Sequence, residues 1–218
     1  YMPIAQDRIL YEDDHLLAVN KLSGELTVRG KGKVQKLPLL DFLKQDYPGI
    51  KAIHRIDYET SGVVVFAKNS NVEQKILSNK FEQWRKTYIT LLMGRLERNQ
   101  GAIRKKLPAR GRGVVDAETL YQVQDMFANS TLAECVITTG RHHQIRLHFA
   151  GIGHPLALDS EYGHGKFNQI FRQELGYSKF FLHASKISFP HPITGETVTI
   201  EAPMPKPFAA CIKKLRSL

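Results

Sequence analysis

The chain has 218 residues, of which 42% are hydrophobic, enough to form a real core in a single domain and to argue against disorder. Its 31 lysines and arginines exceed the 21 acidic residues by ten, which favours nucleic acid as a partner; a generically basic enzyme is the alternative. Two cysteines are too few for a disulfide framework or a metal cage. No apolar run approaches the roughly 20 residues of a membrane-spanning helix. We therefore expect a reduced, cytoplasmic protein, and we expect it to be a monomer.

The first third of the chain alternates short apolar runs with polar turns. Apolar residues on either side of Glu12-Asp13-Asp14 predict two strands, at 9–11 and 16–19. A basic loop follows at 29–36, and then a short helix over 39–45. The β-branched run 62–67 predicts a strand that is buried on both faces.

The middle of the chain begins with a capping box. Ser70 and Glu73 predict a helix from residue 70 to about 85, with Val72, Ile76 and Phe81 on one face. A strand is expected at 87–93, followed by a connection rich in glycine and arginine at 101–113. The pattern then predicts strands near 117–123 and 131–138 and a helix over 141–150 that ends at Gly151.

The last third contains two more helices and a hairpin. The helices are predicted at 167–175, before Gly176, and at 207–215, while 180–189 and 196–202 pair as a hairpin. Strands outnumber helices and occur in pairs. The expected fold is therefore α+β, a mixed and largely antiparallel sheet with flanking helices and an active-site cleft across it, in one catalytic domain over 1–218.

The loop at 54–62, His-Arg-Ile-Asp-Tyr-Glu-Thr-Ser-Gly, carries far more polar chemistry than a turn requires. Asp57 lies two residues from Arg55, and a carboxylate beside a guanidinium stays ionised, so it can act as a nucleophile or a base. A structural role is also open: Asp57 could stabilise the turn through an ion pair, and His54 could be a buried core histidine.

A second polar cluster covers residues 139–148. If these residues form a helix, His142 and Arg146 lie one turn apart, and the Thr139-Gly140 start leaves backbone N–H groups for an anion. The histidine spacing lacks the i, i+4 pair of a zinc helix, so no metal is expected. The sequence also lacks a Gly-x-Ser-x-Gly elbow and a Walker-type phosphate loop.

A basic segment lies between the predicted strands of the middle region. Such runs are usually solvated, but the interleaved glycines and proline predict a flexible arm that follows a phosphate backbone. Its cations are Arg104, Lys105, Lys106, Arg110 and Arg112. The nearby Lys86-Thr87-Tyr88 enters a strand, where a tyrosine alone indicates only packing.

Taken together, these motifs resemble those of the RluA-type RNA pseudouridine synthases. The family signature His-Arg-Leu-Asp-x-x-Thr-Ser-Gly appears at 54–62 with Ile56 in place of Leu. Further matches follow in the family's order over about residues 9–203: Asn20-Lys21-x-Ser-Gly24, Lys86-x-Tyr88, the 139–148 cluster, Gly153-His154-Pro155 and Leu182-His183-Ala184. The resemblance implies an enzyme that isomerises uridine in ribosomal or transfer RNA and needs no cofactor.

The resemblance also implies roles for individual residues. Asp57 is the nucleophile, attacking either carbon 6 of uracil or the anomeric carbon of its ribose. Arg146 pairs with Asp57 and keeps it ionised. Tyr88 packs on the flipped uracil and assists proton transfer, while Arg55 fills the space that the uracil leaves. His54, Thr60 and Leu182 shape the substrate site.

The sequence departs from the family pattern at Leu22, where Pro is usual, and at 156–159, where Leu-Ala-Leu-Asp replaces Ile-x-Gly-Asp. The missing glycine is expected to alter a nearby loop. No accessory N-terminal RNA-binding domain is expected, so the basic arms would capture the RNA. Two alternatives remain: an RNA-binding protein of the same fold without turnover, and a metal-dependent RNA hydrolase.

Overall fold

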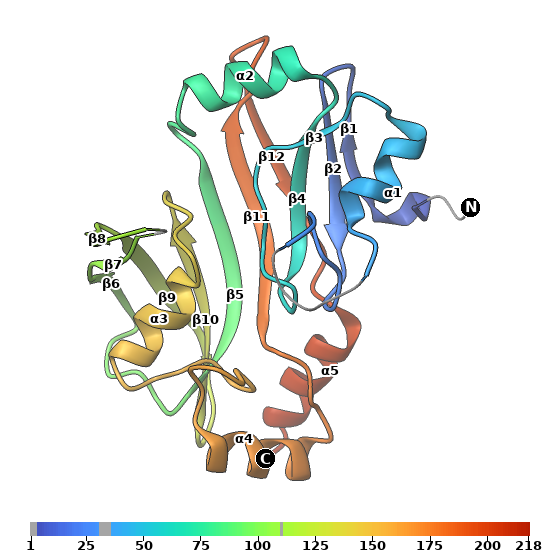
Figure 1. Cartoon of the computed structure of the whole chain (residues 1–218). Helices are drawn as coiled ribbons and strands as arrows, with labels where there is room; N and C mark the ends of the chain where they lie inside the picture. The colour runs from blue at the N-terminus through green and yellow to red at the C-terminus, as the bar shows by residue number, and fades with distance from the viewer. Residues whose placement is uncertain (1–3, 31–35, 110) are drawn as a thin grey trace. The chain divides into compact units, whose positions relative to one another are not determined.

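The computed structural model describes residues 4–30, 36–109 and 111–218 (Figure 1). The chain divides into two compact units. The first, called unit 1 below, runs to Arg85 and includes Ala184–Pro203. The second, unit 2, comprises Lys86–His183 and Met204–Leu218. The expectation of one catalytic domain over 1–218 stays a prediction.

Unit 1 is a sheet with short helices. Its strands lie in the order β1-β2-β4-β11, with β3 paired to β4 and β12 paired to β11. The elements are η1 (Gln6–Arg8), β1 (Ile9–Glu12), β2 (Leu16–Lys21), α1 (Leu39–Asp46), β3 (Lys51–Ala52), β4 (Ser61–Ala67), α2 (Ser70–Ser78), β11 (Leu182–Pro190) and β12 (Thr197–Glu201).

The centre of unit 1 is β4, in which all seven residues are buried. β4 pairs antiparallel with β2 from Leu16 opposite Ala67 to Lys21 opposite Gly62. Because the run of β-branched residues has no polar alternation, it can only be accommodated where both faces of the sheet are covered. Beyond β4, Trp84 stacks on Phe189 of β11, with ring centroids 4.2 Å apart.

Unit 2 contains a second set of strands, in the order β5-β10-β9-β6 (Figure 1). Each neighbouring pair in this set is antiparallel, and β7 and β8 form a separate small hairpin. The elements are β5 (Arg85–Met93), β6 (Gln100–Arg104), β7 (Leu107–Pro108), β8 (Val114–Val115), β9 (Glu118–Met126), β10 (Ser130–Ile137), α3 (Gln144–Gly151), α4 (Gly165–Leu175) and α5 (Lys206–Leu215).

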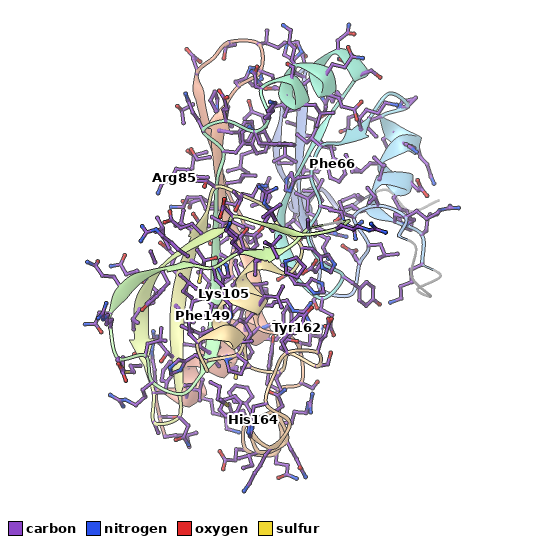
Figure 2. The ribbon with its side chains drawn as sticks, turned by 60° about the vertical axis from the view of Figure 1, so that its left-hand side comes forward. Phe66, Arg85, Lys105, Phe149, Tyr162 and His164 are labelled. Carbon is purple, nitrogen blue, oxygen red and sulfur yellow. The ribbon has the colours of Figure 1, made fainter. Side chains whose placement is uncertain are left out.

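Helices pack on unit 2 in two places. The Phe149 ring of α3 meets the Tyr121 ring of β9 edge-on, with centroids 5.7 Å apart, so α3 covers one face of these strands (Figure 2). The other contact is an apolar cluster around Phe181, which joins α4 and α5 through edge-on contacts with Phe171 and Phe208. The cluster excludes water from one end of the unit.

Two predicted helix boundaries were wrong. α2 ends at Ser78 rather than near 85, because Lys80, Phe81 and Gln83 all adopt positive φ angles that no right-handed helix contains. Its N-cap is Asn69, whose side chain accepts the Val72 N–H, rather than Ser70. α3 begins at Gln144, three residues later than predicted, because the N-cap His143 is left-handed with φ 51°.

The connection at 101–113 also differs from its prediction. It contributes β6 and β7, so Arg104 ends a strand of the sheet and Leu107 pairs with Val115 in the hairpin. Arg110 lies outside the described residues, as does most of the basic loop at 29–36. The prediction of a flexible arm over 104–112 was therefore wrong for Arg104 and for residues 107–108, which lie in strands.

The remaining predicted strands and helices are confirmed, most of them within two residues of their boundaries. With antiparallel pairing throughout the registers above and five α-helices in the described part of the chain, the fold is α+β, as predicted. Within residues 4–30, 36–109 and 111–218, every helix is too short or too polar to cross a bilayer.

Candidate active site

The loop at 54–62 leads into β4 and is held by its own backbone. The Thr60 N–H donates to the Asp57 carbonyl at 3.1 Å, which closes a turn around the carboxylate. Gly62, with φ 113°, ends the loop where a Cβ atom would collide with the carbonyl of Ala184 in β11. Only glycine fits this position, so the signature's last residue fixes how the loop enters the strand.

Lys21 is buried beneath this loop, at the end of β2. Its ammonium donates to the carbonyls of Glu25 at 2.7 Å and of Leu22 and Tyr58 at 3.1 Å each. Burial lowers the pKa of Lys21 to about 7, an effect that the negative charges of Glu25 and Asp57 oppose. The three carbonyls accept from the charged form, so Lys21, when protonated, places a cation close to Asp57 and ties the loop to the 22–25 turn.

The other predicted residues of unit 1 lie in the same loop as Asp57. Arg55 is exposed, and Asp57 itself is half-buried. The His54 Nε2 atom accepts the Val65 N–H at 3.0 Å, and its ring lies edge-on to Trp84, so His54 anchors the loop to β4. Thr60 is 1% exposed, and its Oγ1 atom is buried without a hydrogen-bond partner among the described residues. An orphaned hydroxyl beside the predicted nucleophile is costly and calls for a functional explanation.

In unit 2, Tyr88 lies in β5 on the face that α3 covers. The register places Tyr88 opposite Cys135, which in turn lies opposite Tyr121. Directly opposite residues share one face of a sheet, and Tyr121 contacts Phe149 of α3. Tyr88 and the helix that carries Arg146 are therefore on the same face.

Arg146 is buried and makes a two-pronged ion pair with Asp159. Its Nε atom donates to Oδ2 at 2.7 Å and its Nη2 atom to Oδ1 at 2.8 Å. Burial opposes the charge of Asp159, but the Arg146 guanidinium and two backbone N–H groups outweigh it and hold the pKa of the carboxyl below its usual value. Both groups are therefore ionised at neutral pH.

Aromatic rings enclose the Arg146 guanidinium. The rings of Tyr162 and Phe180 lie 4.8 and 5.2 Å from its central carbon (Tyr162 is labelled in Figure 2). Nη2 also donates to the exposed Glu161 carboxylate at 3.2 Å. Burial and Glu161 raise the pKa of Tyr162 to about 12, so this phenol stays protonated and hydrogen-bonded to His143 at 3.0 Å.

The predicted anion site at Thr139-Gly140 is not a helix N-terminus, because α3 begins later. The Gln144 side-chain carbonyl accepts from Thr139 Oγ1 at 2.7 Å and from the Arg141 N–H at 3.2 Å. The Gln144 amide then donates to the Glu118 carbonyl at 2.8 Å. Gln144 thus uses its side chain to dock the 139–143 turn onto β9.

The described cations of the basic segment are exposed, and two of them have acidic neighbours. Arg104 pairs with Glu118, and Lys106 lies 3.9 Å from Asp116. The Lys105 carbonyl is bound by the ring of the buried His148 at 3.0 Å, two residues beyond Arg146 (Lys105 is labelled in Figure 2). This contact ties the basic segment to α3.

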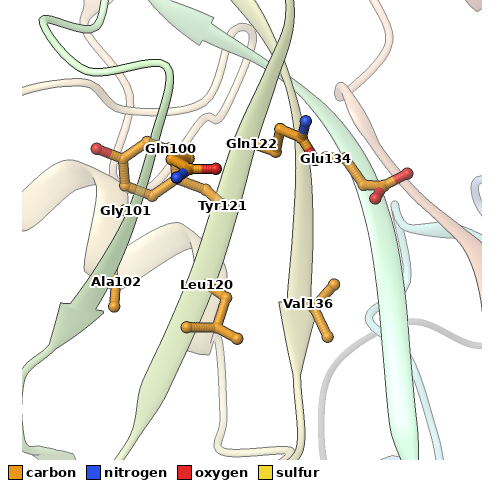
Figure 3. A pocket seen from close by; sticks show the side chains of 8 residues that line it. All are labelled: Gln100, Gly101, Ala102, Leu120, Tyr121, Gln122, Glu134 and Val136. Atoms are coloured by element: carbon orange, nitrogen blue, oxygen red, sulfur yellow. The ribbon is translucent and has the colours of Figure 1, made fainter.

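Leu182 is buried at the start of β11. A separate pocket of about 470 Å³ lies on β6, β9 and β10, where Gln100, Gln122 and Glu134 project (Figure 3). It contains no predicted site residue. Over the described part of the chain, no group of three or more histidine, cysteine or acidic side chains is placed to hold a metal ion.

The predicted residues thus fall into two groups. Unit 1 brings His54, Arg55, Asp57 and Thr60 together, and unit 2 carries Tyr88, Arg146, Leu182 and the basic segment. The prediction that Arg146 pairs with Asp57 stays a prediction. The sequence patterns did not indicate Asp159 as a partner of Arg146. Its position at the end of the 156–159 motif was the one sequence feature that singled it out. The spacing of 13 residues gives no indication of an ion pair with Arg146.

The chain is similar to known proteins over most of its length. Residues 15–151 match the family model described as RNA pseudouridylate synthase. Ribosomal large subunit pseudouridine synthase C of Escherichia coli is 35% identical over 225 residues, covering 97% of this chain and 70% of that protein. Its namesake in Vibrio vulnificus is 33% identical, with 97% and 70% covered.

Solved structures show the same fold. The human RNA pseudouridylate synthase domain containing 4 superposes with a TM-score of 0.80 at 23% identity, covering 96% of this chain and 93% of that one. The human domain containing 1 gives a TM-score of 0.75 at 21% identity, covering 100% and 98%.

Proposed function

Because the chain belongs to the RNA pseudouridylate synthase family, it is an enzyme that isomerises uridine to pseudouridine in RNA, and we propose that large-subunit ribosomal RNA is its substrate and Asp57 its nucleophile. The observation that carries the choice of RNA is the 35% identity, over almost the whole chain, to an enzyme of the large ribosomal subunit. A ribosomal substrate also implies a cytoplasmic location. The charge of +10 supports a polyanionic partner.

The nucleophile is proposed from charge and position. Asp57 is half-buried at the mouth of β4, and the Lys21 ammonium beneath it attracts its negative charge. A nearby cation stabilises the ionised carboxylate, which is the form that can attack an electron-poor carbon. Lys21, His54 and Gly62 each restrain the loop through a separate contact, which limits the reorganisation that the carboxylate needs before attack.

The isomerisation needs no oxidant or reductant. The bond between uracil N1 and the ribose anomeric carbon breaks, and a bond from C5 to the same carbon forms. C5 loses a proton and N1 gains one, so atoms and electrons balance. The Tyr88 hydroxyl is proposed to assist the proton transfer, with its ring packed on the uracil. Arg146 is proposed to keep the nucleophile ionised once water has been excluded.

A uridine stacked in an RNA helix must be flipped out before a carboxylate can reach it. The exposed Arg55 is proposed to fill the vacated space. Outside the pocket, Arg104, Lys105, Lys106, Arg110 and Arg112 are proposed to contact phosphates, and the enzyme is proposed to act as a monomer.

The experiment that tests the substrate is a comparison of pseudouridine maps. Ribosomal and transfer RNA are sequenced after chemical marking of pseudouridine, from cells with the gene, without it, and without it but supplied with either the parent or Asp57→Asn protein. We expect specific large-subunit sites to disappear with the gene and to return only with the parent. Sites lost in transfer RNA alone would reject the proposed substrate, and restoration by Asp57→Asn would reject the nucleophile.

A further inference from the structure

The carboxylate of Asp159 lies at the centre of the Arg146 environment, and it has no role in the chemistry proposed above. Its side chain is 0% exposed, and that of Arg146 is 7% exposed. We propose that Asp159 is the positioning residue of this enzyme: it clamps the Arg146 guanidinium in one orientation, so that the charge meets the reacting groups without rearrangement. The inference rests on the proposed function for its effect on catalysis, but not for the clamp itself.

Asp159 and two aromatic rings restrain the guanidinium both within its plane and out of it. Asp159 takes the Nε–Nη2 edge through two nearly parallel bonds of 2.7 and 2.8 Å, which fixes rotation in the guanidinium plane. Tyr162 and Phe180 lie within about 5 Å and restrict tilting out of that plane. With its Nε–Nη2 edge occupied, Arg146 can meet a further carboxylate only from its Nη1 end or through the Nη2 proton that Glu161 accepts.

The backbone that carries Asp159 is held from both sides by one amide. The Asn168 Oδ1 atom accepts the Leu158 N–H at 2.8 Å, and its Nδ2 atom donates to the Asp159 carbonyl at 3.0 Å. Gly163 approaches so closely that a Cβ atom there would collide with the same carbonyl. Leu158 itself is left-handed, with φ 62°. A strained residue that is held by a buried amide indicates that the orientation of the Asp159 side chain is constrained for a functional reason.

The benefit for catalysis is preorganisation. An arginine side chain has many rotamers, and a cation that must reorient during the reaction loses much of its effect on developing charge. Misplacement of a positioned group by about 1 Å can cost roughly 100-fold in rate. A carboxylate with the geometry of Asp159 prevents that misplacement before substrate binds.

A purely structural role is the competing explanation, because Asp159 also caps a turn. Its Oδ1 atom accepts the N–H groups of Glu161 at 2.9 Å and Tyr162 at 3.0 Å. Asp159→Asn separates the two roles. An asparagine keeps an Oδ1 atom for both turn N–H groups, but it presents N–H donors where the Arg146 Nε donor needs an acceptor. Asp159→Ser is a second variant, since a serine hydroxyl also caps turns and brings no carboxylate.

The chain offers a matched control in the same unit. Arg216 donates from Nε to Oδ2 of Asp125 at 2.7 Å, the same atoms and the same distance as in the Arg146–Asp159 pair. The side chains of this pair are 61% and 30% exposed. Asp125→Asn therefore makes the same chemical change in an exposed pair with no link to Arg146.

The test combines three measurements on the parent, both Asp159 variants and Asp125→Asn. Thermal unfolding establishes that each is folded at the assay temperature. Single-site kinetics on a transcript of large-subunit ribosomal RNA give kcat and KM. Proton–nitrogen NMR follows the Arg146 Nε–H signal, which is assigned by its loss in Arg146→Lys.

We expect both Asp159 variants to lower kcat by roughly 100-fold with KM changed by less than about threefold. The Arg146 Nε–H signal should shift or broaden in these variants only, and Asp125→Asn should match the parent. A folded Asp159→Asn or Asp159→Ser enzyme with kcat within threefold of the parent would overturn the proposal. So would a loss of kcat with the Arg146 signal unmoved, because the effect would then not pass through Arg146.

Failure of the proposed function has a different signature. A parent enzyme that leaves both ribosomal and transfer RNA unmodified would refute that function. The clamp would then be judged by the Arg146 Nε–H signal alone: a shift on Asp159→Asn supports it, and an unchanged signal overturns it.

Discussion

The Leu158 N–H donates to the side-chain carbonyl of Asn168 at 2.8 Å, and this bond braces a leucine whose φ of 62° lies in the left-handed region. Leu158 is also buried, in the cluster that contains Phe171 and Phe181. The position thus combines a backbone suited to glycine with a side chain that contributes to the core. The expectation that the missing glycine alters a nearby loop stays a prediction.

This combination predicts an unusual order of stability at position 158. Leu158→Ala should lose about 2–5 kcal/mol from the removed side chain and retain the strain. Leu158→Gly should lose the same packing but recover about 1–2 kcal/mol of left-handed backbone strain, so it should be more stable than Leu158→Ala. Leu156, which is equally buried and not left-handed, is the control. At this position the alanine variant should be more stable than the glycine variant. Urea denaturation measures both orders; the same order at both positions would contradict the strain.

The buried Thr60 hydroxyl, which has no partner among the described residues, predicts opposite effects on stability and activity. Thr60→Val removes an unsatisfied polar group at nearly constant shape, so unfolding free energy should be unchanged or rise by about 1 kcal/mol. The rate should fall, because we expect Thr60 to shape the turn that carries Asp57. Thr90→Val is the control: Thr90 Oγ1 donates to the Phe181 carbonyl at 2.6 Å, so this variant should lose about 1–3 kcal/mol. A Thr60→Val enzyme with full activity would remove Thr60 from the site.

Replacing Tyr88 by phenylalanine should preserve RNA affinity and reduce kcat by about 10²-fold or more, because packing on uracil survives while the proton-transfer group is lost. Tyr121→Phe makes the same change two strands away in the same sheet and should have little effect on kcat. Filter binding and single-turnover kinetics separate the two quantities. Equal rates for Tyr88→Phe and the parent would leave Tyr88 as a packing residue.

Neutralising Arg104, Lys105 and Lys106 together should weaken RNA binding and flatten the slope of log affinity against log salt by roughly two units. Three full phosphate contacts would change the slope by about 2.1–2.7 units. We expect the lower end of this range because Arg104 and Lys106 already have acidic neighbours. Neutralising Lys213, Lys214 and Arg216 changes the net charge equally at the end of α5 and serves as the control. Identical slopes for the two triple variants would show that the basic segment does not grip the RNA.

The Asp159 carboxyl predicts a specific dependence of stability on pH. Its pKa in the folded protein is below the unfolded value of about 4, so the unfolded chain binds the proton more tightly. The stabilisation is therefore fully present above about pH 4 and is lost as the pH falls through the folded pKa. Unfolding free energies of the parent and Asp159→Asn, measured from about pH 7 to 2, should differ most at neutral pH and converge in acid. A constant difference would mean that the pKa of the carboxyl is the same in the folded and unfolded chains, which would contradict the ion pair with Arg146.

Much of this molecule could be read from local patterns. The strand β4 follows from an unbroken run of β-branched residues, and the end of α4 follows from Gly176, which adopts φ 65° at the C-cap. The polar residues at 54–62 marked a functional loop for the same reason: a turn does not need them. Hydrophobic periodicity, helix caps and turns depend on residues that are close in the sequence, so they can be predicted from the sequence alone.

Contacts between distant segments could not be read in this way. α2 was predicted too long because Ile76 and Phe81 continue its apolar pattern, yet the chain turns left-handed after Asn79 and Trp84 stacks on Phe189 instead. Lys21 meets the carbonyl of Tyr58, 37 residues away, and Arg146 meets Asp159 across an intervening turn. Burial, which comes only from the packed chain, makes a lone charge costly and selects these partners. The chemistry of each side chain is local, whereas the group that holds it in place is chosen by packing.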